Sequence, residues 1–166
     1  MNYHIRPVRP SDAEAIADIY AHYVRHTCIS FETVPPTVDE MRQRICHISD
    51  GHPYYVAETE EQRIVGYCYA HPWKDRAAYA RTFETTIYLA IDAHRQGIGS
   101  ALMQKLITAC RTDTEAHVLV ACITQGNEPS ERLHESLGFS LASRFHEVGR
   151  KFGRWLDVVD YELVLG

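Results

Sequence analysis

The sequence lacks any long apolar run. No segment approaches the roughly 18 consecutive apolar residues that a membrane-spanning helix needs. The first residues, Met1 to Arg6, have no apolar core of the kind found in secretion signals. Dense runs of lysine and arginine are also missing, and 22 acidic residues outnumber 17 basic ones, giving a net charge of -5. These absences argue against a membrane protein or a nucleic-acid-binding protein and predict a cytoplasmic location.

Patterns typical of metal sites and disulfide frameworks are missing as well. The five cysteines are an odd number, are widely spaced and form no C-x-x-C pair, which predicts reduced, mostly buried thiols. Two of the ten histidines, His22 and His26, have helical i, i+4 spacing. Neither a third ligand nor a carboxylate cluster accompanies them, so we expect no metal site.

What is present is a regular alternation of strand-like and helix-like segments. Two capping boxes, Ser11–Glu14 and Thr37–Glu40, are expected to start the first two helices. Later helices are expected at 98–111 and from Asn127 or Pro129 to Gly138. The predicted strands are 3–8, 54–58, 64–69, 83–91, 118–123, 139–148 and 155–164. The order β-α-α-β-β-β-α-β-α-β-β predicts one α/β domain over residues 1–166, with parallel pairing in the second half.

A glycine-containing turn, His94-Arg95-Gln96-Gly97-Ile98-Gly99, joins the strand 83–91 to the helix that follows it. Its glycines let the backbone approach a bulky ligand, and the free amides and dipole of the helix favour a diphosphate. Ser100 adds a hydroxyl donor and Arg95 a positive charge. The pattern alone is equally typical of tight packing in α/β proteins.

Two other phosphate-binding motifs are absent. The sequence contains no G-x-x-x-x-G-K-S/T loop, which argues against nucleotide hydrolysis of that type. No G-x-G-x-x-G follows the first strand, and the glycine turn comes too late in the chain for a dinucleotide fingerprint.

The turn resembles the acetyl-CoA loop Q/R-x-x-G-x-G/A of the GNAT superfamily, with His94 in the first position. Residues 127–139 resemble that superfamily's N-x-x-A/S-x-x-L-Y/H-x-x-x-G-F helix. The resemblance implies a GNAT fold, a mixed, mostly antiparallel sheet of about seven strands flanked by about four helices. It also implies acetyl-CoA as cosubstrate, with no metal, bound by Tyr88, Leu89, Ala90, His94, Arg95, Gln96, Gly97, Ile98, Gly99, Ser100, Asn127 and Ser130.

Across nearly the whole length, the chain is similar to the phosphinothricin acetyltransferase group. The matching segments are 30–33, 71–79, 82–88, 127–139 and 151–157. This resemblance implies a homodimer that acetylates the α-amine of an amino-acid-like small molecule such as phosphinothricin, methionine sulfoximine or methionine sulfone. No cysteine lies beside a general base in the sequence, which favours direct transfer over an acyl-enzyme.

The resemblance suggests roles for individual side chains. Glu84 matches the family position of a general base that takes the amine proton, although a glutamate in a strand can also face solvent. His134 stands where relatives carry a proposed proton donor to the departing thiolate; the alternative is a helix histidine satisfied by its neighbours. We expect Phe31, Lys74, Arg76 and Tyr79 to bind the substrate, with Arg76 facing its carboxylate or phosphinate.

Two other functions stay open at this point. A protein or peptide N-acetyltransferase needs an open groove, whereas the aromatic and basic segment from Trp73 to Tyr79 is better suited to covering a small pocket. A non-catalytic acetyl-CoA-binding module needs no base, and the presence of Glu84 argues against it.

Overall fold

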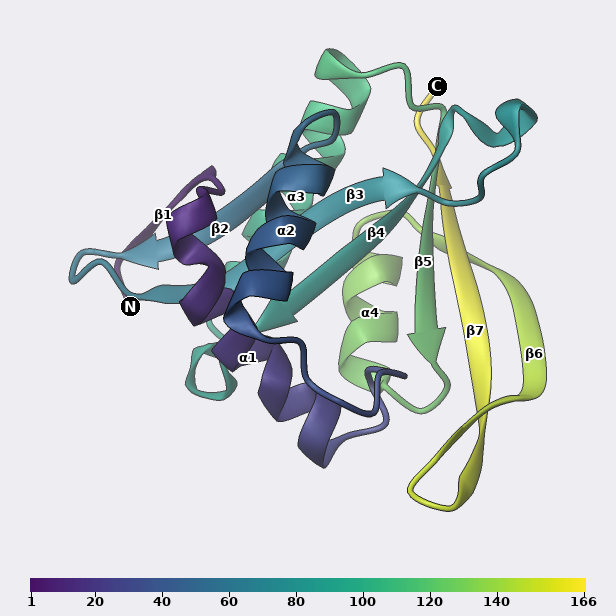
Figure 1. Cartoon of the computed structure of the whole chain (residues 1–166). Helices are drawn as coiled ribbons and strands as arrows, with labels where there is room; N and C mark the ends of the chain where they lie inside the picture. The colour runs from purple at the N-terminus through teal and green to yellow at the C-terminus, as the bar shows by residue number, and fades with distance from the viewer.

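Seven strands form one sheet in the order β1-β2-β3-β4-β5-β7-β6, in a computed structural model that describes residues 1–166 (Figure 1). All neighbours are antiparallel except β4 and β5, which are parallel. This confirms the expected mixed, mostly antiparallel sheet. The strands are β1 (Tyr3–Pro7), β2 (Tyr54–Thr59), β3 (Ile64–Pro72), β4 (Thr82–Leu89), β5 (Val118–Thr124), β6 (Ser140–Lys151) and β7 (Arg154–Val164).

Helices cover both faces of the sheet. On one face α1 (Ala13–His26) and α2 (Val38–Ser49) bury an apolar stripe against β2 and β3, in a cluster that includes Ile16, Ile45 and Val56. On the other face α3 (Ile98–Asp113) packs Leu102 and Leu106 against the sheet, and residues of α4 (Glu128–Ser136) lie against the same cluster. Within each helix the buried apolar residues recur at three- or four-residue spacing, as Leu102 and Leu106 do, which places them on one side of the helix. No helix is long and apolar enough to span a bilayer.

The two predicted helix starts have different outcomes. At α2 the capping box is confirmed, because the Glu40 amide donates to the Thr37 hydroxyl and the Thr37 amide donates to the Glu40 carboxylate. At α1 the predicted Ser11–Glu14 box is wrong. A 3-10 turn, Pro10–Asp12, precedes the helix, and the Arg9 amide donates to the Asp12 carboxylate at 2.7 Å.

A network of ion pairs explains why Asp12 accepts the backbone hydrogen bond before α1 in place of the predicted Ser11–Glu14 box. Arg6 donates to both oxygens of Asp12 at 2.9 Å and to both oxygens of Glu58 at 2.8 Å. The three side chains are at most 15% exposed, so the bonds link β1, β2 and the start of α1 with little screening by solvent.

The cysteines are free, as predicted, but they are not mostly buried. Cys68 and Cys110 are buried in the core beneath α3, and Cys28 is half-buried. Cys46 and Cys122 are exposed. The prediction fails there because Cys46 lies on the outer face of α2, and Cys122 lines a cavity described below.

The sheet opens between β4 and β5. Only three residue pairs join these strands, Thr82 with Val118, Phe83 with Leu119 and Glu84 with Val120. Beyond Glu84, β4 stays paired with β3 while β5 stays paired with β7 through Thr124, so the two strands diverge (Figure 1). A gap therefore forms in the middle of the sheet without breaking either half.

Candidate active site

Glu84 lies at the point where β4 and β5 separate. It is the last residue of β4 that pairs with β5, and its side chain is 27% exposed. Burial raises the pKa of its carboxyl, an effect that the nearby His71 imidazole opposes. A carboxylate that is partly desolvated yet reachable from a cavity is suited to accept a proton near neutral pH.

The predicted diphosphate turn has the geometry of an anion site. Gly97 has a φ of +77° and caps the N-terminus of α3, and apart from its own residue and its two chain neighbours nothing lies within 4 Å of the position that its Cβ would take. No side chain caps this helix, so amides of its first turn are free to donate to a ligand. Gly99 is buried beneath them, where a Cβ would lie 3.4 Å from a Leu89 methyl group. These features fit the diphosphate of acetyl-CoA.

Other residues of the turn hold it in place. The His94 imidazole is hydrogen-bonded through Nε2 to the Tyr23 hydroxyl at 2.9 Å, and that hydroxyl donates to the Leu89 carbonyl at 2.6 Å. Gln96 donates to the Asp92 carbonyl at 2.9 Å. His94 therefore ties the turn to α1 and, through Tyr23, to the end of β4, while Gln96 ties it to the 3-10 turn Ile91–Ala93.

A narrow slot fills the gap between β4 and β5. Its volume is about 130 Å³, and it extends from Glu84 to the start of α4. Asn127 lines it, and its side chain makes no capping hydrogen bond to α4. The complete lining is Ile29, Glu84, Thr85, Thr86, Ile87, Tyr88, Ala121, Cys122, Ile123, Thr124, Asn127, Ser130 and His134.

His134 lies at the far side of this slot and is only 3% exposed. Its Nδ1 is 2.8 Å from the Ser130 carbonyl oxygen, which can only accept, so Nδ1 carries the proton in the neutral ring. Burial lowers the pKa of the imidazole. The neutral form is therefore favoured, with a lone pair rather than a proton on Nε2.

A larger cavity of about 520 Å³ opens on the other side of Glu84, beneath α1 and α2. Five tyrosines from α1, β2, β3 and β4 form much of its wall: Tyr20, Tyr54, Tyr67, Tyr69 and Tyr88. Phe31, a predicted substrate-binding residue, also lines it. We call this larger cavity the acceptor cavity. Glu84 and Cys122 line both the acceptor cavity and the slot, so the two spaces meet at the Glu84 carboxylate.

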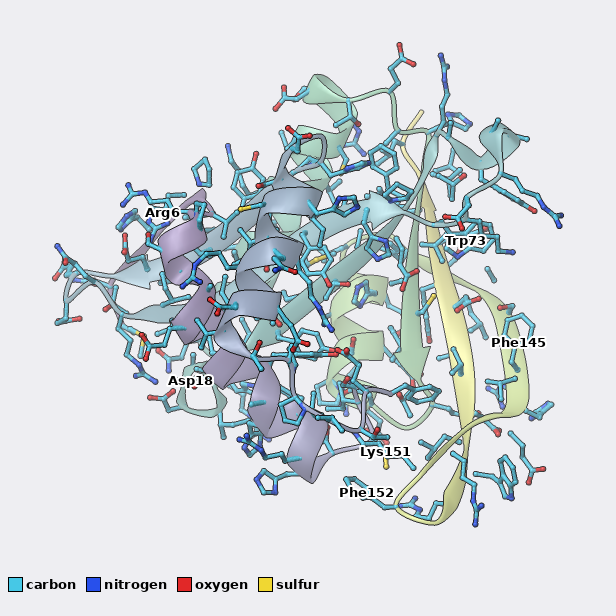
Figure 2. The ribbon with its side chains drawn as sticks, viewed as in Figure 1. Arg6, Asp18, Trp73, Phe145, Lys151 and Phe152 are labelled. Atoms are coloured by element: carbon cyan, nitrogen blue, oxygen red, sulfur yellow. The ribbon has the colours of Figure 1, made fainter.

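Arg44 is the only lysine or arginine that lines this cavity, and its guanidinium group is already ion-paired. Arg44 of α2 donates to both oxygens of Glu32 at 2.6 and 2.9 Å. Nearby, buried Lys151 donates to the Ser30 carbonyl at 2.7 Å, and Figure 2 shows Lys151 beside the segment that follows α1. These contacts hold the cavity wall at residues 30–32 against α2 and β6.

The other three predicted substrate-binding residues do not line the acceptor cavity. Lys74, Arg76 and Tyr79 lie in the loop between β3 and β4, at the periphery of the molecule (Figures 1 and 2). Lys74 lies over the Trp73 ring, 4.0 Å from its centre, and Tyr79 packs edge-on against the same ring. The sequence led us to expect that this loop covers the substrate pocket. In the structure, its three predicted substrate-binding residues do not line the cavity of their own chain.

Several residues of the site were not found from the sequence. The tyrosines come from four separate elements, and only the strand register shows that they face one cavity. His71 lies directly opposite Glu84 in the β3–β4 ladder, with its Nε2 3.9 Å from the Glu84 Oε2. Aligning residues 64–72 and 82–89 as neighbouring antiparallel strands would have predicted that His71 and Glu84 lie opposite each other.

Comparisons with known proteins agree with this geometry. A family model described as an acetyltransferase (GNAT) domain matches residues 5–159. A phosphinothricin N-acetyltransferase of Streptomyces coelicolor is 42% identical over 162 residues, which are 95% of this chain and 94% of that protein. An L-methionine sulfoximine/L-methionine sulfone acetyltransferase of Pseudomonas aeruginosa is 31% identical, over 99% of this chain and 96% of that protein.

A solved structure supports the fold and the cosubstrate. It is a GNAT superfamily phosphinothricin acetyltransferase from Sinorhizobium meliloti in complex with acetyl-CoA, 34% identical with a TM-score of 0.95, covering 100% of this chain and 90% of that one. The open sheet, the uncapped glycine turn before α3 and these similarities together show that this chain belongs to the GNAT acetyltransferase family and is an acetyl-CoA-dependent N-acetyltransferase.

Proposed function

We propose that the enzyme acetylates the α-amine of an amino-acid-like small molecule of the phosphinothricin, methionine sulfoximine or methionine sulfone type. The observation that carries this proposal is the meeting of two spaces at Glu84, an acceptor cavity of about 520 Å³ and the slot beside the turn. The cavity has the volume of a small-molecule site. Its tyrosine hydroxyls suit the oxygen atoms of a phosphinate, sulfoximine or sulfone group.

In the reaction, Glu84 accepts a proton from the substrate ammonium group, directly or through a water. The amine nitrogen attacks the thioester carbon, a C–N bond forms, and collapse of the tetrahedral intermediate breaks the C–S bond. The second proton of the attacking nitrogen passes to the departing sulfur, so CoA leaves as the thiol. Acetyl-CoA lies with its diphosphate at the amides of Gly97 to Ser100 and its pantetheine in the slot beside Asn127 and Ser130.

Cys122 supports direct transfer rather than an acyl-enzyme. It lines both spaces and is exposed to them. Desolvation by the surrounding protein atoms, together with the charge of Glu84, raises the pKa of its thiol well above its usual value. A protonated thiol is a poor nucleophile, so the amine attacks acetyl-CoA itself.

For His134 we propose a binding role in the slot. Its Nε2 accepts a hydrogen bond from the pantetheine arm or from the CoA thiol. Proton donation to the thiolate needs the imidazolium form, which burial of the ring disfavours.

We also propose a homodimer in which the Trp73–Arg81 loop of one copy covers the acceptor cavity of the other. This arrangement would bring Lys74, Arg76 and Tyr79 to a cavity that has no unpaired lysine or arginine of its own to receive the substrate carboxylate. The β6–β7 hairpin offers apolar surface for association, with five large side chains about half exposed: Leu141, Phe145, Val148, Trp155 and Val164. Figure 2 shows Phe145 on this outer strand.

A CoA-release assay tests the substrate class. Phosphinothricin, methionine sulfoximine and methionine sulfone are expected to release CoA, whereas free proteinogenic amino acids and peptides release much less. Arg76→Ala is expected to raise the KM for the active substrate without changing the Kd for acetyl-CoA. Release with peptides alone would make the enzyme a peptide acetyltransferase.

A further inference from the structure

His71 stands in a position that the acetyl transfer described above does not use. It pairs directly with Glu84 across the antiparallel β3–β4 ladder, so both side chains project from the same face of the sheet. The two side chains are 32% and 27% exposed, and the His71 Nε2 lies 3.9 Å from the Glu84 Oε2. This places a titratable ring beside the base, on the side away from β5 and the slot.

The hydrogen bonds of His71 define which nitrogen faces the carboxylate. Its Nδ1 is 2.9 Å from the Pro72 carbonyl oxygen, which can only accept, so Nδ1 carries the proton. The neutral ring then presents the lone pair of Nε2 to Glu84. The separation of 3.9 Å is too long for a direct hydrogen bond, so a proton that passes between the two side chains would pass through a water.

His71 also connects two spaces. It lines the acceptor cavity, and it lines a second, outer cleft of about 580 Å³ between the end of α2 and the start of the β3–β4 loop. Substrate fills the acceptor cavity and acetyl-CoA fills the slot during the reaction. Ile48, Tyr69 and His71 line both the acceptor cavity and the outer cleft, and of these His71 is the one that pairs with Glu84.

We propose that His71 relays the substrate proton from Glu84 to solvent in the outer cleft, a role that rests on Glu84 being the base. The N–H bond of the ammonium breaks as an O–H bond forms on Glu84. That O–H bond breaks as a bridging water takes the proton and passes one of its own to the Nε2 of His71. The imidazolium then releases a proton to water in the cleft, which restores the carboxylate and the neutral ring.

The groups around His71 fit this direction of transfer. From β3, Tyr69 lies beside the ring, and burial raises the pKa of its phenol, so it stays neutral. His52, before β2, has its pKa lowered by burial and by the positive charge of His71 and His47. Asp50 and Asp75 line the same cleft and offer negative charge where the proton leaves. The cleft is not arranged to hold a metal ion.

The test compares His71→Gln and His71→Ala with the wild-type enzyme, using the acceptor found most active in the CoA-release assay. Glutamine keeps a donor for the Pro72 carbonyl but cannot carry a proton, and alanine leaves room for free imidazole. In dilute buffer, at a pH where Glu84 is fully ionised, kcat is expected to fall about 10-fold, less than the loss of a general base. Added imidazole restores kcat in His71→Ala but does not change the wild-type rate.

The matched control is His26→Gln, because His26 is an exposed histidine at the end of α1 and lines neither space. It is expected to leave kcat and its buffer dependence unchanged. A wild-type kcat in both His71 variants, in dilute buffer at a pH where Glu84 is ionised and the substrate amine is still protonated, would overturn the relay, and so would a loss that imidazole does not restore. A merely electrostatic role would shift the acid limb of the pH profile and leave kcat above that limb unchanged.

Parallel measurement of Glu84→Gln separates the two proposals. Full turnover in Glu84→Gln would mean that Glu84 is not the base, whatever the His71 variants do. Loss of turnover in Glu84→Gln together with normal His71 variants would overturn the relay alone.

Discussion

Replacing Glu84 by glutamine removes the carboxylate charge and keeps the shape of the side chain between the acceptor cavity and the slot. A general base contributes about 10²–10⁴-fold to the rate, so Glu84→Gln is expected to reduce kcat by about that factor. This corresponds to about 3–5 kcal/mol of activation free energy. The loss is expected to be smallest at high pH, where the free amine is already deprotonated. The Kd for acetyl-CoA is expected to change little, because Glu84 is not among the residues proposed to hold acetyl-CoA.

The same substitution is expected to stabilise the protein. Burial raises the pKa of Glu84 in the folded state above its value in the unfolded chain. A group of this kind contributes stability that is fully present below its unfolded pKa, about 4.3 for glutamate, and lost as the pH rises through the folded pKa. At neutral pH the folded protein therefore holds an unfavourably desolvated carboxylate. Glu84→Gln removes this penalty, so its free energy of unfolding exceeds that of the wild type near neutral pH and not well below pH 4.

Two measurements on one pair of proteins check the prediction. CoA release as a function of pH gives kcat, and urea unfolding at neutral and acidic pH gives stability. Glu84→Asp serves as a control that keeps the charge but withdraws the carboxylate by one methylene group. Unchanged kcat in Glu84→Gln would refute the role of Glu84 as base. A lower free energy of unfolding at neutral pH would refute the desolvation argument, because the carboxylate would then be stabilised by its surroundings.

Three further substitutions follow from contacts in the structure. Gly99→Val is expected to weaken acetyl-CoA binding far more than His94→Ala, because a Cβ at Gly99 already lies 3.4 Å from a neighbouring methyl group; equal Kd values would contradict this. Gly149→Ala is expected to raise the acceptor KM at unchanged acetyl-CoA Kd, since its Cβ would lie 2.2 Å from the Phe31 ring and displace that wall of the cavity; an unchanged KM would argue against it. Arg6→Met is expected to lower the free energy of unfolding at pH 7 by about 3 kcal/mol, the lower end for a broken buried ion pair. That loss shrinks in acid as the two freed carboxylates protonate, and urea unfolding across pH measures it.

The fold could be predicted almost completely because its signals are local. The Thr37 capping box and the terminating Gly138 depend on a few neighbouring residues, and both helix ends lie where the sequence places them. The start of α1 was mispredicted for the opposite reason. The Asp12 carboxylate is occupied by Arg6, whose other partner lies on β2, and no local pattern reports that contact.

The site was predictable in part for the same reason. The glycine turn and Glu84 belong to contiguous motifs, so their places could be assigned from residue order. The tyrosine wall and the position of His71 opposite Glu84 depend on how separate strands align. Lys74 and Arg76 matched a substrate motif, but a motif does not show which cavity a surface loop covers, or in which copy of the chain.

The short contact between β4 and β5 affects the cohesion of the whole molecule. The backbone ladder joins a half that contains α1 to α3 to a half that contains β5, α4, β6 and β7 through only three residue pairs. The apolar core beneath α3 and side-chain bonds such as that from the Thr124 hydroxyl to the Cys28 carbonyl also join the two halves. Acetyl-CoA bound in the slot would contact both halves at once and hold them together where β4 and β5 diverge. Acetyl-CoA is therefore expected to stabilise the contact between the two halves where the backbone ladder is short, and to raise the resistance of this region to local unfolding.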